Sequence, residues 1–234
     1  MNFAEGEILP FDKPYGWTSF DIVGKVRWMI CNKLGIKKLK VGHTGTLDPL
    51  ATGVVVVCTG RSTKKIDKLQ AQEKEYVATL QLGATTPSYD MEHPIDKTYG
   101  TDHITEDLIV SVLKQFQGEI LQTPPAYSAV KVNGKRAYDY ARKGEEPEIK
   151  SKRITIHKID ILSFDPQNMR LELKIECSKG TYIRALARDI GQALGSGAYL
   201  TALRRTRSGD FRAEDSLTIE QFEKLLSTYT IPTE

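Results

Sequence analysis

The carboxylate best placed to do chemistry in this sequence is Asp48. Between positions 22 and 66 it is the only acidic side chain, and it stands among nine basic ones: Lys25, Arg27, Lys33, Lys37, Lys38, Lys40, Arg61, Lys64 and Lys65. Surrounding positive charge favours the ionised form of a carboxylate. The basic side chains suit the binding of a polyanion. A single acidic side chain among them would repel that polyanion, so its presence indicates that it has a function. We interpret Asp48 as a nucleophile held against an RNA.

The residues around Asp48 describe a shaped loop. Positions 42–53 contain three glycines and a proline, and they lead directly into four consecutive valines. The ordinary alternative is a structural turn, because Asp-Pro pairs start turns readily. On that pair alone the turn is the better interpretation. The isolated charge, the density of glycine and the presence of His43 five residues upstream favour a functional loop.

Three further segments carry side chains suited to the same chemistry. Lys13 lies in what reads as a turn before a helix, Tyr76 begins a strand, and Arg184 stands on the first turn of a helix. An arginine there opposes the helix macrodipole unless a carboxylate or phosphate receives it, and Asp48 is a candidate. Taken singly, the Lys13 segment is explained equally well by an ordinary turn that leads into a helix, and a lone tyrosine such as Tyr76 is more often an amphipathic sheet residue than a catalytic group.

Hydrophobic periodicity and capping signals place these segments on elements. A helix is predicted from Ser19, with Thr18 and Asp21 as a capping box, and it ends at Gly35. The other predicted helices cover residues 62–69, 105–117, 137–142, 182–194 and a last stretch from 218. The predicted strands cover residues 53–59, 76–82, 154–164, 169–177 and 199–207. Strands joined by hairpins without steady βαβ alternation predict an α+β fold around a largely antiparallel sheet flanked by helices.

The segment 122–149 is long, polar and basic. It contains an Asn133-Gly134 hairpin signal and five cationic side chains: Lys131, Lys135, Arg136, Arg142 and Lys143. Acidic residues crowd instead into positions 90–107 and 145–148. A second basic concentration, between Lys179 and Arg212, would extend a phosphate-binding face if the fold brings it near Asp48. Solvated surface is the plain alternative.

The totals exclude several classes of protein. A chain of 234 residues with 40% apolar content and a net charge of +3 suits one large globular domain, or one domain with an appendage. No apolar run reaches the roughly 18 residues that span a bilayer, and the N-terminus has no signal-peptide pattern. Three scattered cysteines and four histidines show no metal spacing. We therefore expect a cytoplasmic protein without metal.

Together these segments resemble the bacterial tRNA pseudouridine synthase B (TruB) family, which isomerises uridine to pseudouridine at position 55 in the T loop of tRNA. The resemblance covers residues 6–209. The Asp48 loop is highly specific to the family. The segment around Lys13, the Pro-Pro-Ala-Tyr-Ser-Ala-Val-Lys run ending at Lys131, and the Gly-Thr-Tyr-Ile-Arg turn ending at Arg184 follow in the expected order.

The resemblance implies a role for each matching residue. Asp48 is the catalytic nucleophile, Arg184 pairs with it, and Tyr76 stacks on the target base and takes the C5 proton. His43 extrudes the target nucleotide, and the family needs no metal or organic cofactor. The other residues that the resemblance places at the substrate are Lys13, Tyr182 and Leu203. The two basic segments add Lys131, Arg204 and Arg205 as predicted RNA contacts.

The reaction explains why such residues are needed. The uracil is detached from C1′, turned and rejoined through C5, so the site must hold a free base. Flipping a base out of a stacked loop costs a few kcal/mol, and stacking on an aromatic ring returns roughly 1–3 kcal/mol. Three routes stay open for Asp48: attack at C1′, attack at C6, or abstraction of a ribose proton to give a glycal.

The same resemblance predicts the organisation of the chain. Residues 1–212 form a catalytic domain with a pseudouridine-synthase fold, the segment 122–149 is an RNA-binding insertion, and residues 213–234 form a short helical tail. Many relatives carry a separate C-terminal RNA-binding domain, whereas only 22 residues follow Arg212. The expected partner is the T arm of tRNA, with no membrane, no obligatory protein partner and a monomeric state.

Two rival functions remain open. A non-catalytic RNA-binding or RNA-chaperone module would explain the basic segments and the tyrosines, but not a carboxylate among them. A nucleotidyl transferase would explain the His-Thr-Gly-Thr sequence that starts at His43, although a second histidine and a P-loop lysine motif are both missing. A comparison with an Asp48→Asn variant and an assay of ATP consumption separate these functions from the isomerase.

Overall fold

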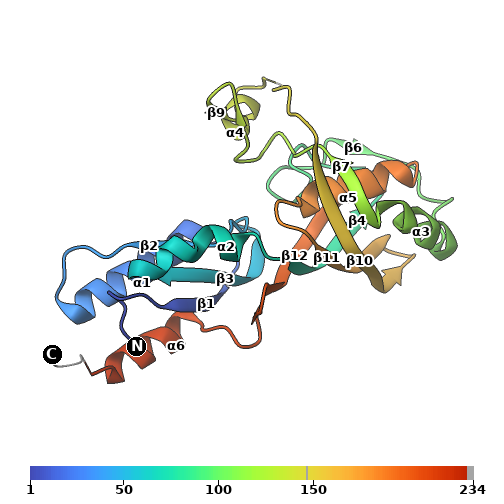
Figure 1. Ribbon diagram of the computed structural model, residues 1–234. Helices are drawn as coiled ribbons and strands as arrows, with labels where there is room; N and C mark the ends of the chain where they lie inside the picture. The colour runs from blue at the N-terminus through green and yellow to red at the C-terminus, as the bar shows by residue number, and fades with distance from the viewer. Residues whose placement is uncertain (146, 231–234) are drawn as a thin grey trace. The chain divides into compact units, whose positions relative to one another are not determined.

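The computed structural model describes residues 1–145 and 147–230, and its chain divides into two compact units (Figure 1). The first unit comprises Met1–Glu75 together with Arg204–Glu234, and the second comprises Tyr76–Leu203. Two strands, β4 (Lys74–Leu82) and β12 (Ala198–Ser208), contain the boundaries between the units. Both units contain strands and helices, so the predicted α+β class is confirmed.

The sheet of the first unit is built around β3 (Ala51–Thr59), which is almost entirely buried. β1 (Ile8–Lys13) pairs with it antiparallel, with Lys13 opposite Gly53. On the other side, β2 (Val41–His43) pairs with the end of β3, and β12 follows next in the sheet order. A short strand, β13 (Phe211–Arg212), pairs with β12. The Asp48 loop therefore connects two neighbouring antiparallel strands.

Three helices gather around these strands (Figure 1). The longest is α1 (Ser19–Leu34), which has the predicted Thr18 and Asp21 capping box and ends at Gly35 in the left-handed conformation. α6 (Ile219–Thr228) begins with a second capping box, and its Phe222 ring meets Phe11 edge-on at 5.2 Å. The helix predicted over residues 62–69 is divided into a 3₁₀ turn (Gly60–Lys65) and α2 (Ile66–Gln70).

The segment around Lys13 differs from its prediction as a turn. Lys13 is the last residue of β1, its side chain is fully buried, and the turn begins only at Pro14. A buried lysine interrupts the apolar alternation that marks a strand, so the pattern hides β1 from sequence inspection. The turn itself is real, and it leads to the Thr18 cap of α1 as expected.

The sheet of the second unit runs in the order β12, β4, β11, β10 and β7. β10 (Lys152–Asp165) pairs antiparallel with both β11 (Arg170–Cys177) and β7 (Gly118–Gln122). Helices α3 (Glu106–Leu113) and α5 (Ile183–Ala193) belong to this unit, which also holds the small β5–β6 ladder (Ala84–Thr85, Lys97–Thr98). The predicted alternation of β11 is confirmed, because Leu171, Leu173, Ile175 and Cys177 are all buried.

The predicted hairpin at Asn133-Gly134 is confirmed. β8 (Lys131–Val132) pairs with β9 (Lys135–Arg136), and both turn residues have positive φ, at 49° and 81°. Such angles define the type I′ turn that an Asn-Gly pair favours. α4 (Ala137–Ala141) follows at once, and Figure 1 shows it with β9 in a small lobe. Glu146, part of the acidic run noted in the sequence, lies outside the described residues, as do positions 231–234 of the predicted tail.

Within residues 1–145 and 147–230, no helix is long and apolar enough to cross a membrane. Over the same residues, no three histidine, cysteine, aspartate or glutamate side chains gather as metal ligands.

Candidate active site

The loop that carries Asp48 is fixed to α1. The Ser19 hydroxyl accepts a hydrogen bond from the Leu47 N–H at 2.8 Å and lies 3.2 Å from the Leu47 carbonyl, to which it donates. Ala51 N–H donates to the Asp48 carbonyl at 3.0 Å and closes a turn. Ser19, Leu47 and Ala51 are buried, whereas Asp48 stays half-exposed. A rigid scaffold therefore presents an accessible carboxylate.

Lys13 fixes the same loop from the end of β1. Its buried ammonium donates to three carbonyls, those of Trp17 at 2.6 Å, Pro14 at 3.1 Å and Pro49 at 3.3 Å. Burial lowers the pKa of Lys13 from 10.5 to about 8, the Asp48 carboxylate opposes that shift, and the charge of Arg205 adds to it. Lys13 thus supplies a positive charge close to Asp48. Its hydrogen bonds also hold the turn that follows β1 and the Asp48 loop at Pro49.

Arg205 fixes the other side of the loop. Its guanidinium is only 3% exposed and donates to three carbonyls, those of Val54 at 2.7 Å, Gly45 at 3.2 Å and Thr46 at 3.3 Å. Gly53 allows this close approach, since a Cβ built there would lie 2.1 Å from the Arg205 carbonyl oxygen. These hydrogen bonds of Arg205 therefore hold the backbone of the Asp48 loop and the residue that follows it. A direct contact of Arg205 with RNA stays a prediction.

Arg204, the adjacent residue, makes an ion pair. Its two Nη atoms donate to the two carboxylate oxygens of Asp12 at 2.8 and 3.0 Å. Both side chains are partly exposed, so Arg204 keeps a face toward solvent. The predicted contact of Arg204 with RNA remains a prediction.

His43 ends β2 directly before the Asp48 loop. Its Nδ1 accepts the N–H of Gly45 at 3.2 Å, and its ring meets that of Phe20 edge-on at 5.2 Å. Burial lowers the pKa of His43, and the positive charge of Arg205 lowers it further. The ring is therefore neutral at pH 7, with its proton on Nε2, which suits insertion among bases better than a fixed charge does.

Arg184 is held by several polar groups of the second unit. It stands in the first turn of α5, is buried, and its Nε lies 3.5 Å from the Asp90 carboxylate. It also donates to the carbonyls of Tyr127 at 2.9 Å and Ser88 at 3.1 Å. Asp90 in turn accepts the Ser88 hydroxyl and the Glu92 N–H. A buried network thus holds the guanidinium against the unfavourable end of the helix dipole.

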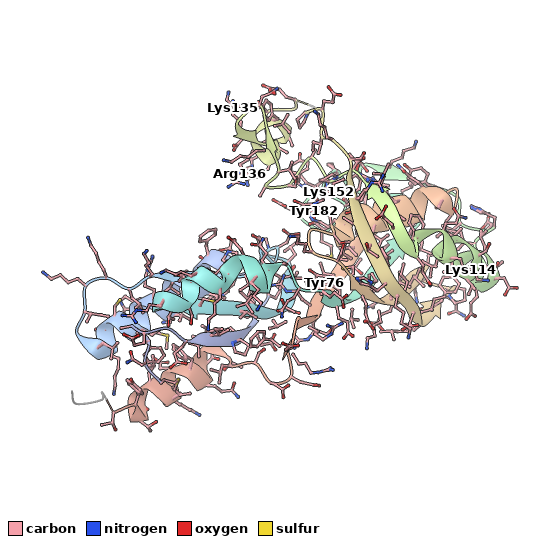
Figure 2. The ribbon with its side chains drawn as sticks, in the orientation of Figure 1. Tyr76, Lys114, Lys135, Arg136, Lys152 and Tyr182 are labelled. Carbon is pink, nitrogen blue, oxygen red and sulfur yellow. The ribbon has the colours of Figure 1, made fainter. Side chains whose placement is uncertain are left out.

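Tyr182 is held at the start of α5. Its backbone N–H and carbonyl are both bound by the Gln122 side-chain amide, at 2.9 and 3.1 Å. The Lys152 ammonium lies 4.5 Å above the Tyr182 ring (Figure 2), and burial lowers the pKa of this lysine. Gly180 leaves room for Lys152, because a Cβ there would lie 3.2 Å from its Nζ.

The remaining predicted residues are also in the second unit. Tyr76 is the third residue of β4 and has 8% of its surface exposed, and Leu203 is half-buried in β12. Lys131 is exposed on the hairpin, where Lys135 and Arg136 follow in β9 (Figure 2).

The structure thus gathers the predicted residues into two sets. Lys13, His43, Asp48, Arg204 and Arg205 belong to the first unit, and Tyr76, Lys131, Tyr182, Arg184 and Leu203 belong to the second. The pairing of Asp48 with Arg184 stays a prediction.

Sequence inspection missed four supporting residues. Asp90, Ser19, Gln122 and Lys152 all hold a predicted site residue or its neighbour. Each contact joins residues distant in the chain, so no local pattern marks it. The one available signal was the arginine at the start of α5, which indicated a buried carboxylate partner.

Known proteins similar to this chain have consistent descriptions. Residues 32–183 match the TruB family pseudouridylate synthase N-terminal domain, and residues 184–231 match the tRNA pseudouridylate synthase B C-terminal domain. A tRNA pseudouridine synthase B from Phocaeicola vulgatus is 58% identical over 231 residues, which cover 99% of this chain and 97% of the relative. One from Bacteroides fragilis is 60% identical over 222 residues, with coverages of 95% and 94%.

The fold is also similar to that of a solved structure. A chain in the crystal structure of a Cbf5-Nop10-Gar1 complex matches with a TM-score of 0.69 and 32% identity, over 95% of this chain and 54% of that one. This chain therefore spans about half the length of that neighbour. Together with the family match, the likeness confirms the predicted pseudouridine-synthase fold.

Proposed function

The chain belongs to the TruB family of pseudouridylate synthases, and from this premise we propose that it isomerises uridine to pseudouridine at position 55 in the T loop of tRNA. The two relatives above are both described as tRNA pseudouridine synthase B. Asp48 is the nucleophile of the reaction. The T arm of tRNA is the substrate, the protein acts in the cytoplasm, and it works as a monomer without a cofactor.

The observation that carries this proposal is the fixed loop around a single carboxylate. Ser19, Lys13 and Arg205 hold the backbone on both sides of Asp48 by direct hydrogen bonds. A preorganised charge stabilises a developing opposite charge without reorganising during the reaction. As the glycosidic bond breaks, the sugar carbon C1′ becomes electron-poor, so a rigid anion at this position is what the step requires.

The reaction divides among the residues in a definite way. The N1–C1′ bond breaks, the freed uracil turns, a C5–C1′ bond forms, and the proton leaves C5 while N1 gains one. Tyr76 stacks on the base and removes the C5 proton, and Arg184 pairs with Asp48 to keep it ionised. Tyr182 and Leu203 line the base pocket. Lys131 and Arg204 contact the RNA backbone.

Base extrusion falls to His43. A neutral imidazole inserts among stacked bases without the cost of burying a charge, and the lowered pKa of His43 supplies that neutral form.

Residues 1–212 form the catalytic domain, with residues 122–149 as its RNA-binding insertion and residues 213–234 as a short tail.

The ionisation of Lys13 predicts a dependence of the reaction on pH. Its pKa of about 8 means that Lys13 loses its charge as pH rises through that value, and Asp48 then loses a nearby positive partner. We expect the single-turnover rate to fall above about pH 8, and a Lys13→Arg variant to move this fall to higher pH. Rates measured on tRNA between pH 6.5 and 9.5 check this, and identical profiles for the two proteins would contradict it.

The same group predicts a trend in stability with a definite sign. Between about pH 8 and pH 10.5, the unfolded chain binds more protons at Lys13 than the folded chain does. The contribution of this residue to the free energy of unfolding therefore increases with pH in that window. Urea unfolding of the wild type and Lys13→Met at pH 8 and pH 10 measures it, and the increase should be smaller in the variant.

The proposed function is tested by tritium release. A tRNA transcript without modifications, labelled with tritium at C5 of its uridines, should release one tritium for each tRNA when incubated with the protein. A transcript with cytidine at position 55 should release none. Binding of the first transcript without release would leave a binding or chaperone module. Consumption of ATP in the same reaction would favour the nucleotidyl transferase.

A further inference from the structure

The exposed face of α1 carries an unusual pair of aromatic side chains. Phe20 is 73% exposed and Trp28 is 59% exposed, whereas Ile22, Val26 and Ile30 on the opposite face are buried. Phe20, Gly24 and Trp28 recur every four residues, so they form one stripe along the helix. Gly24 leaves open space between the two rings, because a Cβ built there would meet no atom within 4 Å.

A hollow adjoins this stripe. It has a volume of about 570 Å³ and is lined by Gly16, Trp17, Phe20, Asp21, Gly24 and Lys25. The Asp21 carboxylate is committed to the cap of α1, where it accepts the Thr18 N–H and hydroxyl, each at 2.7 Å. The rest of the lining is an aromatic, glycine and lysine surface, which fits a flat ring rather than a compact charged group.

The basic side chains of α1 and of the segment that follows it indicate which class of partner the stripe binds. The Lys25 ammonium lies 5.1 Å above the Trp28 ring, and Arg27, Lys37, Lys38 and Lys40 are exposed nearby in the sequence. Alternating aromatic and cationic side chains are the composition of single-stranded nucleic-acid sites, where bases stack and cations follow the phosphates. Protein interfaces are depleted of lysine, so the composition favours RNA over a protein partner.

The stripe is continuous with the site proposed above. The Phe20 ring contacts the ring of His43, the residue assigned to base extrusion. An RNA whose loop is opened at His43 therefore has unpaired bases within reach of α1. We propose that the Phe20–Trp28 face of α1, with Lys25, binds unpaired bases of the substrate RNA by stacking. This inference rests on the proposed function for its substrate.

Binding measurements on the full chain test the inference. The variants are Trp28→Ala, Trp28→Phe and Lys25→Gln, with Leu162→Ala as control, because Leu162 is 48% exposed on β10 of the other unit. The probes are an unmodified tRNA transcript and its isolated T-arm hairpin. Trp28→Ala should raise the Kd for tRNA about tenfold, within the range measured for one stacked base, and Lys25→Gln should also raise it. Trp28→Phe and Leu162→Ala should bind as the wild type does.

The T-arm hairpin identifies the source of the base. Loss of affinity for both probes places the stacked base in the T arm, and loss for tRNA alone places it elsewhere in tRNA; either result supports the proposal. The protein's two tryptophans, Trp17 and Trp28, both belong to this surface, so binding of the tRNA should also quench tryptophan fluorescence. A wild-type Kd for Trp28→Ala, with a wild-type melting temperature, would overturn the proposal.

Two further outcomes separate this inference from its alternatives. Self-association of the wild type that Trp28→Ala abolishes, without a change in RNA affinity, would make the face an interface between copies of this chain and overturn the inference. Because the readout is affinity, a wild type that binds tRNA without releasing tritium would end the proposed function and still leave the α1 inference to be decided by the Kd values.

Discussion

Replacing Asp48 by asparagine is expected to reduce the single-turnover rate of pseudouridine formation by roughly 10⁴-fold or more, the scale seen when a nucleophile is removed. Asparagine has the same shape, so the turn closed by the Ala51 N–H and the Asp48 carbonyl is kept. What is lost is the negative charge and the carboxylate oxygen that we propose as the nucleophile. At about 1.36 kcal/mol for each factor of ten, the loss corresponds to roughly 5 kcal/mol of transition-state stabilisation.

Two controls make the Asp48 result specific. Asp67→Asn removes an exposed carboxylate from α2 in the same unit, and it should leave the rate unchanged. The affinity of Asp48→Asn for tRNA should equal or exceed that of the wild type, because the variant removes a negative charge that repels the phosphates of the RNA. A rate within tenfold of the wild type would remove Asp48 from the chemistry.

Replacing Arg184 by lysine is the second large effect that we expect. Lysine keeps the charge but not the planar fork that serves Asp90, Ser88 and Tyr127 at once. The pairing proposed for Asp48 then loses its geometry, and the single-turnover rate should fall about 10²- to 10³-fold. Breaking a buried ion pair also costs about 3–5 kcal/mol of stability, so Arg184→Met should unfold at a lower urea concentration than Arg184→Lys.

Arg188→Lys is the matched control on the same helix. Arg188 pairs with the adjacent Asp189, donates to the Thr123 carbonyl and lies over the Tyr89 ring, and no role in the reaction is assigned to it. Its substitution should change the rate much less than Arg184→Lys does. Equal losses of rate in the two variants would show that the effect comes from disturbing α5 rather than from the Arg184 guanidinium.

Local signals predicted much of the fold. The Thr18 and Thr218 caps, the Gly35 end of α1 and the Asn133-Gly134 hairpin each depend on a few adjacent residues, and the structure contains all of them. Strands β10 and β11 followed from alternation and a turn between them. These features need no knowledge of distant contacts, which is why a single sequence reveals them.

The missed features depend on distant partners. Strand β1 ends in a buried lysine, and one of the carbonyls that receive its ammonium belongs to Pro49 of the Asp48 loop, 36 positions further along the chain. Arg205 bonds Thr46 across 159 positions of the chain, and a charged residue in a strand reads as surface until that partner is known. The prediction that Arg205 contacts RNA rests on the basic run to which it belongs, and such a run predicts a charged face but not which of its members is buried.

The candidate site shows the same division. The isolated charge and the glycine density around Asp48 indicated a functional loop from the residues alone, whereas the roles of Tyr76, Tyr182 and Leu203 came from the family resemblance. Neither the residues alone nor the family resemblance identified Asp90 as the partner of Arg184, although an arginine at the start of α5 required a partner. Its carboxylate lies 94 positions before Arg184 in the sequence, and only the folded second unit brings the two together.

Identification of the product at a single nucleotide tests the proposed reaction and the role of Asp48 together. A tRNA transcript with one labelled uridine, at position 55, is incubated with the wild type and with Asp48→Asn, digested to nucleotides and separated by chromatography. The label is expected to move to pseudouridine with the wild type and to stay in uridine with the variant. Labelled uridine after incubation with wild-type protein that binds the tRNA would contradict this expectation.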